Sequence, residues 1–256
     1  MRAPMLAPRV EVTAATADDT CMRPLSNGMR PLSNLTRRAA RDAHDRAFAE
    51  SQSMPGNLLP HERLDELVGA ARLIVGEVGR LPEAPYDLGG PCEHPIDATV
   101  VGLLVGRRLD LTEAALLQLG LGLFLQDIGL LALPAAIAGK SGPLSDAEAE
   151  LMRRHPKHGL ELLRHDDVRP EARGVVRYHH ERWDGLGYPS GLAGAEIPPL
   201  ARIAALANAF TSVSSQPEAV EMLRAGAGRE FDPELVEIFA DVALARSPGL
   251  QPTAAA

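Results

Sequence analysis

The segment FLQDIGLLALP, residues Phe124 to Pro134, joins an apolar run to a turn. Its first residues end the run LLQLGLGLFL, Leu116 to Leu125, which is much shorter than the roughly 18 apolar residues of a membrane-spanning helix. We therefore expect a buried core helix that ends in the polar pair Gln126 and Asp127. An uncharged glutamine beside an aspartate at the end of a core helix needs a chemical explanation.

Composition excludes several classes of protein. The chain has 256 residues, of which 45% are hydrophobic, enough for one core and a tail. A formal net charge of -8 provides no basic surface for nucleic-acid phosphates. Cys21 and Cys92 show no disulfide or metal-finger spacing, and the N-terminus has too short an apolar segment for a signal peptide. We expect a cytoplasmic protein that binds neither nucleic acid nor membranes.

The chain divides into a tail, a domain and a second short tail. Residues 1–56 are rich in Ala, Arg, Pro and Ser and repeat MRPLSN at 22–27 and 29–34. Such a segment buries too little to offset its ordering entropy, so we predict a disordered or partly helical tail. A helix over Leu35 to Ser53 would dock on the domain or form a dimer. Residues 57–248 form the predicted helical domain, and 249–256 a flexible C-terminal tail.

Apolar residues in the domain recur at spacings of three and four, the helical period. This pattern appears in ERLDELVGAARLIVGEVGRL, ATVVGLLVGRRL, LARIAALANAFTSV and PELVEIFADVALA, and no run alternates as a strand does, so the class is all-α. Thr112 and Ser145 are expected to cap helices, and Pro156 to kink or restart one. DGLGYPSGLAGAEIPP is an ordered loop candidate, because it keeps Trp183 and Tyr188 beside so many turn residues.

Four histidines and an aspartate are candidate metal ligands. They are His94, Asp127, His155, His179 and His180. Histidine and carboxylate suit Zn, Mn, Fe or Ni, although a single histidine is more often a surface or core residue than a ligand. Neighbours on a helix point about 100° apart, so His179 and His180 can face one pocket only at a helix end.

The segment YHHERWDGLGYPSGLAGAEIPPLARI, 178–203, resembles the signature of the HD-GYP family, the bacterial HD-superfamily phosphohydrolases that degrade cyclic di-GMP. The similarity extends over about residues 59–245. It includes QDIGLLALP, the His155-Pro156 pair 28 residues after Asp127, and the closing helix GREFDPELVEIF. The resemblance implies an HD-superfamily helical bundle with an ordered GYP loop.

The resemblance also implies a metal-ligand set. The family's first metal is held by residues at the positions of His94, Gln126, Asp127 and Asn208, and its second by those at Asp127, His155, His179 and His180. Here Gln126 replaces the family's histidine and Asn208 its last aspartate. The second site is complete and the first is degenerate. One divalent transition metal (Fe, Mn, Zn or Ni) per chain is therefore expected, or none.

Two further departures concern the substrate. Leu130 replaces the family's lysine, and the Arg-Pro-Tyr-Arg-like stretch that follows the last ligand is missing. A substrate or partner loop remains, formed by Trp183, Asp184, Gly185, Gly187, Tyr188, Pro189 and Arg202. Its aromatic residues either stack on a guanine base or pin the loop to the core. Arg202 either meets a phosphate or pairs with Asp184 or Glu181.

Two functions follow from the resemblance. We favour a catalytically impaired member that works in cyclic di-GMP signalling as a sensor, regulator or interaction module, with a diguanylate cyclase or another signalling protein as the expected partner at the GYP loop. The alternative is an active phosphodiesterase that acts on cyclic di-GMP or a related nucleotide through a mononuclear or unusual centre. In that case Asp127 would be the catalytic bridging ligand.

Overall fold

The computed structural model describes residues 32–53, 59–81, 94–140, 142–163, 168–213 and 215–244, and these ranges are helical apart from loops and two isolated β-bridges. The elements are α1 (Asn34–Ser53), α2 (His61–Gly79), α3 (His94–Arg108), α4 (Glu113–Leu125), η3 (Ile128–Ala132), α5 (Ala135–Ala138), α6 (Asp146–Met152), α7 (His155–Leu162), α8 (Pro170–Tyr178), η4 (Gly194–Glu196), α9 (Pro199–Thr211), α10 (Gln216–Gly226) and α11 (Pro233–Leu244). The all-α prediction is confirmed.

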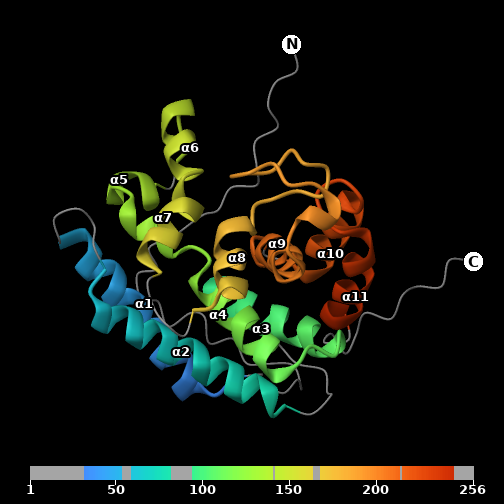
Figure 1. Ribbon diagram of the computed structural model, residues 1–256, viewed down its shortest axis with the longest axis horizontal. Coiled ribbons are helices and arrows are strands. Elements are labelled where there is room, and N and C mark those ends of the chain that lie inside the picture. The colour runs from blue at the N-terminus through green and yellow to red at the C-terminus, as the bar shows by residue number, and fades with distance from the viewer. Residues whose placement is uncertain are drawn as a thin grey trace, which may run out of the picture.

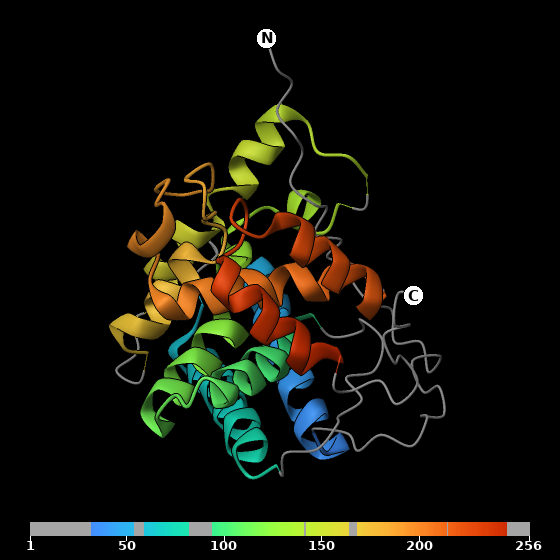
Figure 2. The same ribbon diagram turned by 90° about the vertical axis from the view of Figure 1, so that its right-hand side faces the viewer.

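The helices surround a central group made of α3, α4, α8 and α9. In Figure 1, α1 and α2 cover one side of this group, while α10 and α11 lie on the opposite side. The view in Figure 2, turned by 90°, shows α6 projecting away from the rest, as it also does in Figure 1. Helices α3, α4, α8 and α9 therefore connect the pair α1 and α2 with the pair α10 and α11.

Close helix crossings bury the second part of α4, from Gln118 to Leu125. A Cβ atom on Gly120 would lie 2.3 Å from a methyl group of Val75 in α2, and one on Gly122 would lie 2.5 Å from Cβ of Val175 in α8. Only glycine permits such an approach without displacing the partner helix. As a result, the end of α4, where Gln126 and Asp127 follow, lies in the centre of the domain.

The stretch Glu113–Ala132 is long and apolar enough to cross a membrane by length and composition, and 72% of its 18-residue apolar window is buried inside the fold. Helices that are apolar all round are typical of the core of a soluble protein as well as of a membrane span. The burial agrees with the buried core helix expected at Leu116 to Leu125.

Local sequence signals place the helix ends as expected. Ser145 and Glu148 form a capping box at the start of α6, and the Thr112 hydroxyl accepts a hydrogen bond from the Ala115 amide in α4. Pro156 stands in the first turn of α7, where its missing N–H costs nothing, so the chain restarts a helix there.

The helix expected over Leu35 to Ser53 is present as α1 and packs on α2. Ala40, Ala43 and Ala47 form its buried stripe. The first copy of the MRPLSN repeat and the C-terminal tail lie outside the described residues. The proposed domain boundaries stay a prediction.

Gly129 fixes the distance between η3 and α7. A Cβ atom at this position would lie 1.8 Å from the backbone oxygen of His155 and 2.6 Å from the backbone nitrogen of Gly159. Both neighbours are backbone atoms and cannot rotate away. The glycine thus holds Asp127, two residues earlier, beside His155.

Gly129→Ala should lower the free energy of unfolding by about 2 kcal/mol or more, because overpacking costs roughly 1–3 kcal/mol and here two backbone segments must separate. Urea denaturation measures the change. The matched control is Gly174→Ala in α8, where nothing lies within 4 Å of the added methyl group. That variant should be neutral or more stable by up to about 1 kcal/mol. Equal stability of the two variants would contradict the packing argument.

Candidate metal centre

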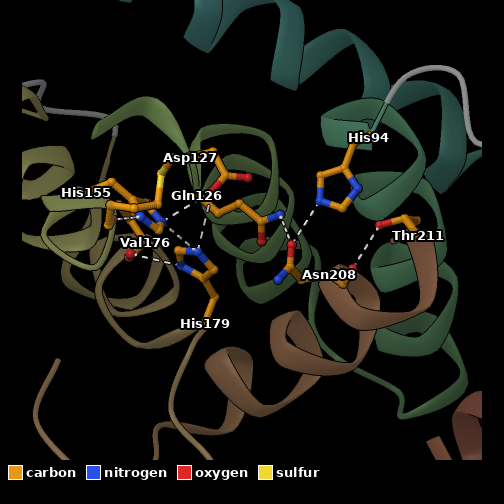
Figure 3. Close-up of polar contacts among 9 residues, drawn as sticks. His94, Gln126, Asp127, His155, Val176, His179, Asn208 and Thr211 are labelled. Carbon is orange, nitrogen blue, oxygen red and sulfur yellow. Dashed lines mark hydrogen bonds and ion pairs between the residues drawn. The ribbon is translucent and has the colours of Figure 1, made fainter. Parts of the chain in front are cut away.

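Four side chains from three helix ends converge in the middle of the domain. Asp127 follows α4, His155 begins α7, and His179 and His180 follow α8. One ligand atom of each lies within 4.8 Å of the others. Figure 3 shows Asp127, His155 and His179 directed toward one point. Because α8 ends at Tyr178, both neighbouring histidines can face the same pocket, as the sequence suggested.

Hydrogen bonds fix which ring nitrogen of His155 and of His179 faces Asp127. Nδ1 of His155 donates to the Met152 carbonyl at 2.8 Å, and Nδ1 of His179 donates to the Val176 carbonyl at 3.0 Å. A carbonyl oxygen only accepts, so Nδ1 carries the proton and Nε2 of a neutral ring presents a lone pair. These backbone contacts are the outer partners that orient metal-ligating histidines.

Three electron-pair donors therefore meet at short range. The two Nε2 atoms of His155 and His179 lie 3.2 Å apart, and they lie 3.3 and 3.6 Å from Oδ1 of Asp127. Lone pairs of neutral imidazoles repel one another and repel a carboxylate unless a cation lies between them. The nitrogen and oxygen donors suit a divalent transition metal. The residues present fit a metal ion.

Burial and mutual contact set the protonation states in this cluster. Burial raises the pKa of Asp127, but its close approach to His155 and His179 outweighs this effect and holds the pKa well below its usual range. Burial lowers the pKa of His179, and burial together with His179 and His155 lowers that of His180 well below normal. An ionised carboxylate beside neutral imidazoles is the state that binds a metal.

The positions of the family's first metal site form a hydrogen-bonded cluster. Nε2 of His94 lies 2.9 Å from Oδ1 of Asn208, and Nε2 of Gln126 donates to the same oxygen at 3.3 Å. Gln126 is fully buried, and its Oε1 has no hydrogen-bond partner. In Figure 3 these three side chains lie beside the Asp127 group. The other two side chains occupy the Asn208 oxygen, and the three residues together provide one imidazole and no carboxylate, so this cluster does not fit a transition metal.

The GYP loop between α8 and α9 is held by a buried carboxylate that sequence analysis named only as a partner for Arg202. Glu181 is 3% exposed, and its two oxygens accept hydrogen bonds from the Ser190 and Leu192 amides. The ring of Tyr188 stacks on His180 with centroids 4.6 Å apart. The signal for Glu181 was its place directly after His179 and His180. The loop therefore lies against the metal cluster.

Arg202 contacts neither Asp184 nor Glu181 in the described structure. Its guanidinium pairs with Asp232 at 3.0 Å and lies 5.7 Å from the Trp183 ring centroid. Asp184 pairs with Arg182 instead, at 2.7 Å. The expected pairing was wrong because Arg182 and the loop amides engage the two loop carboxylates, while Asp232, directly before α11, accepts from Arg202. Trp183 and Arg202 thus tie the loop to the C-terminal helices.

A chelator should lower the melting temperature of the metal-loaded chain by about 5 to 10 °C. A ligand at 100 times its dissociation constant stabilises the native state by about 2.7 kcal/mol, and about 1 kcal/mol shifts the melting temperature by roughly 2–4 °C in a chain of this size. Calorimetry with and without EDTA measures the shift. Asp127→Ala is the control and should show little response. An unchanged wild-type curve would contradict metal binding.

Comparison with known proteins agrees with this geometry. A family model described as HD domain matches residues 94–235. A cyclic di-GMP phosphodiesterase of Pseudomonas aeruginosa is 35% identical over 157 residues, which cover 57% of this chain and 37% of the relative. A cyclic di-GMP phosphodiesterase response regulator of Xanthomonas campestris is 38% identical over 52% of this chain and 38% of its own length. This chain thus spans less than half the length of these two relatives.

Similarity to solved structures supports the same fold. An HDG"Y"P protein from Bdellovibrio bacteriovorus superimposes with a TM-score of 0.59 at 17% identity, covering 81% of this chain and 70% of that protein. At this level of identity the likeness concerns the fold alone.

Proposed function

The chain belongs to the HD domain family, and from this premise we propose that it is a degenerate HD-GYP-type domain of cyclic di-GMP signalling. In this proposal one metal is held by Asp127, His155, His179 and His180. The domain acts as a cytoplasmic sensor, regulator or interaction module and not as an efficient phosphodiesterase. The nucleotide class is taken from the names of the relatives in Pseudomonas aeruginosa and Xanthomonas campestris.

The observation that carries this proposal is the contact between His94 and Asn208. A histidine nitrogen that donates to an amide oxygen at 2.9 Å has no lone pair left for a metal on that atom. Gln126 donates to the same oxygen, so Asn208 also has its acceptor capacity filled. Hydrogen bonds therefore replace metal bonds at the first site, while the second site keeps its full set of donors.

Loss of the first metal lowers the rate of phosphodiester hydrolysis more than it weakens phosphate binding. A bound metal supplies Lewis-acid stabilisation of charge on a phosphoester oxygen, and in two-metal sites both the attacking and the leaving oxygen receive it. If one ion contributes about 4 kcal/mol, its absence costs roughly a thousandfold in rate, since each 1.36 kcal/mol is tenfold. Asp127 and the three histidines would then hold a single metal, which is enough to bind and orient a phosphate.

The protein partner in this proposal is a diguanylate cyclase or another signalling protein that docks on the GYP loop. The loop is pinned by Glu181 and Arg202, yet Leu186 at its surface is 79% exposed. A rigid loop with one exposed apolar side chain is suited to a protein contact, because little entropy is lost on docking. Such a contact does not depend on the first metal.

The alternative function is an active phosphodiesterase with a mononuclear centre. The complete second cluster favours it, because the four ligand atoms converge as a working metal site requires. Metal-loaded wild type and Asp127→Ala, assayed side by side with cyclic di-GMP and manganese or iron, separate the two functions. We expect wild-type turnover to be absent or roughly a thousandfold below that of a two-metal phosphodiesterase assayed beside it. Turnover near that of the two-metal enzyme, lost in Asp127→Ala, would establish the alternative.

Metal content tests the proposed site directly. Elemental mass spectrometry of wild type should give about one metal per chain, and the double variant Gln126→His with Asn208→Asp should give about two, because it restores imidazole and carboxylate donors at the first site. Gln126→Glu alone, which adds one carboxylate but leaves Asn208 in place, serves as the control and should remain near one. Two metals in the wild type would show that the amide side chains are ligands and would overturn the proposal.

A further inference from the structure

His180 is held differently from the other two histidines of the metal centre. Nδ1 of His155 and Nδ1 of His179 donate to backbone carbonyls, and these hydrogen bonds fix both rings. The His180 ring makes no hydrogen bond to the part of the chain that the structure describes, and it contacts three other rings. It also lies beyond the end of α8 at Tyr178. The orientation of this ligand therefore depends on ring contacts.

Tyr188 of the GYP loop makes the most nearly parallel of these contacts. Its ring plane lies 19° from that of His180, with the ring centroids 4.6 Å apart. The rings of His179 and His155 meet His180 at 45° and 88°. The torsion that turns a histidine ring has a broad energy minimum. A parallel neighbour narrows this minimum, because a turned imidazole would push its edge into the phenol ring.

Backbone contacts of the loop hold Tyr188 in this position. Its N–H donates to the His180 carbonyl at 3.1 Å. A Cβ atom on Gly187 would lie 2.4 Å from the Arg182 nitrogen and 2.6 Å from the His180 oxygen, so the loop lies directly on this backbone. The buried Glu181 carboxylate accepts hydrogen bonds from two amides further along the loop. The Tyr188 ring is thus fixed relative to the ligand on which it stacks.

We propose that Tyr188 is a positioning residue for the metal, because its ring holds the His180 imidazole where its ligand atom meets those of the other three ligands. The inference rests on the proposed function, which assigns one metal to this cluster. It differs from the two roles considered for the loop aromatics, since the ring stacks on a ligand of the protein itself. The aromatic face carries this role, and the hydroxyl does not.

The test measures the zinc affinity of the metal-free full chain by competition with a chromophoric chelator. Tyr188→Leu keeps an apolar side chain but no flat ring, and it should weaken zinc binding by roughly 10- to 100-fold, the usual effect of losing a partner that orients a ligand. Tyr188→Phe keeps the ring and should bind as wild type does. Tyr178→Leu, at a tyrosine whose ring lies against Arg177, is the matched control and should also bind as wild type does.

A second pair of variants separates positioning from a general structural role. If Tyr188 acts through His180, adding Tyr188→Leu to His180→Ala should cause no further loss of zinc affinity beyond that of His180→Ala alone. A residue that only stabilises the loop would lower the affinity by the same factor in both backgrounds. Equal factors would therefore overturn the inference.

Each other outcome has a defined meaning. Unchanged zinc affinity in Tyr188→Leu overturns the inference and leaves the proposed function standing. Zinc binding by Tyr188→Phe as weak as that of Tyr188→Leu does the same, because the aromatic face would then not be sufficient. Wild type that binds no zinc overturns the proposed function, and the inference with it.

Discussion

Repulsion among three electron-pair donors is the constraint on which the centre of this domain depends. His155 and His179 present Nε2 lone pairs 3.2 Å apart, beside the Asp127 carboxylate. Backbone carbonyls hold both Nδ1 protons, so the rings cannot relieve the repulsion by exchanging their nitrogens. A cation between the donors changes this repulsion into attraction, and metal affinity is thereby built into the hydrogen bonding of α7 and α8.

The packing of the helices supports this arrangement from outside. Glycines at the crossings of α4 with α2 and α8 bring its end to the centre, and Gly129 brings η3 against the backbone of α7. Ligands that come from three different helix ends keep their geometry only if those ends cannot separate. Rigid packing of the apolar helices therefore fixes the positions of the metal ligands as well as stabilising the fold.

The change at the first metal position shows how a site is lost without loss of fold. Gln126 and Asn208 are uncharged, so a buried cluster that lacks a metal carries no unpaired charge, which would be costly in the interior. The amide of Gln126 and the His94 ring both hydrogen-bond to the Asn208 oxygen, and Oε1 of Gln126 is a buried atom without a partner. A histidine at position 126 and an aspartate at position 208 would gain or lose protons with pH. Their charges would stabilise the fold only when an ion neutralised them.

The sequence by itself determined the helical class, the helix caps, the restart at Pro156 and the candidate ligands, because these depend on local periodicity, on capping chemistry and on motif spacing. Only the tertiary structure decided which donors face one another, that Arg202 pairs with Asp232, and that Glu181 anchors the loop. It also placed α1 against η3, the element that directly follows Asp127. These contacts join residues far apart in the chain, and their partners are chosen by helix packing, which no local pattern specifies.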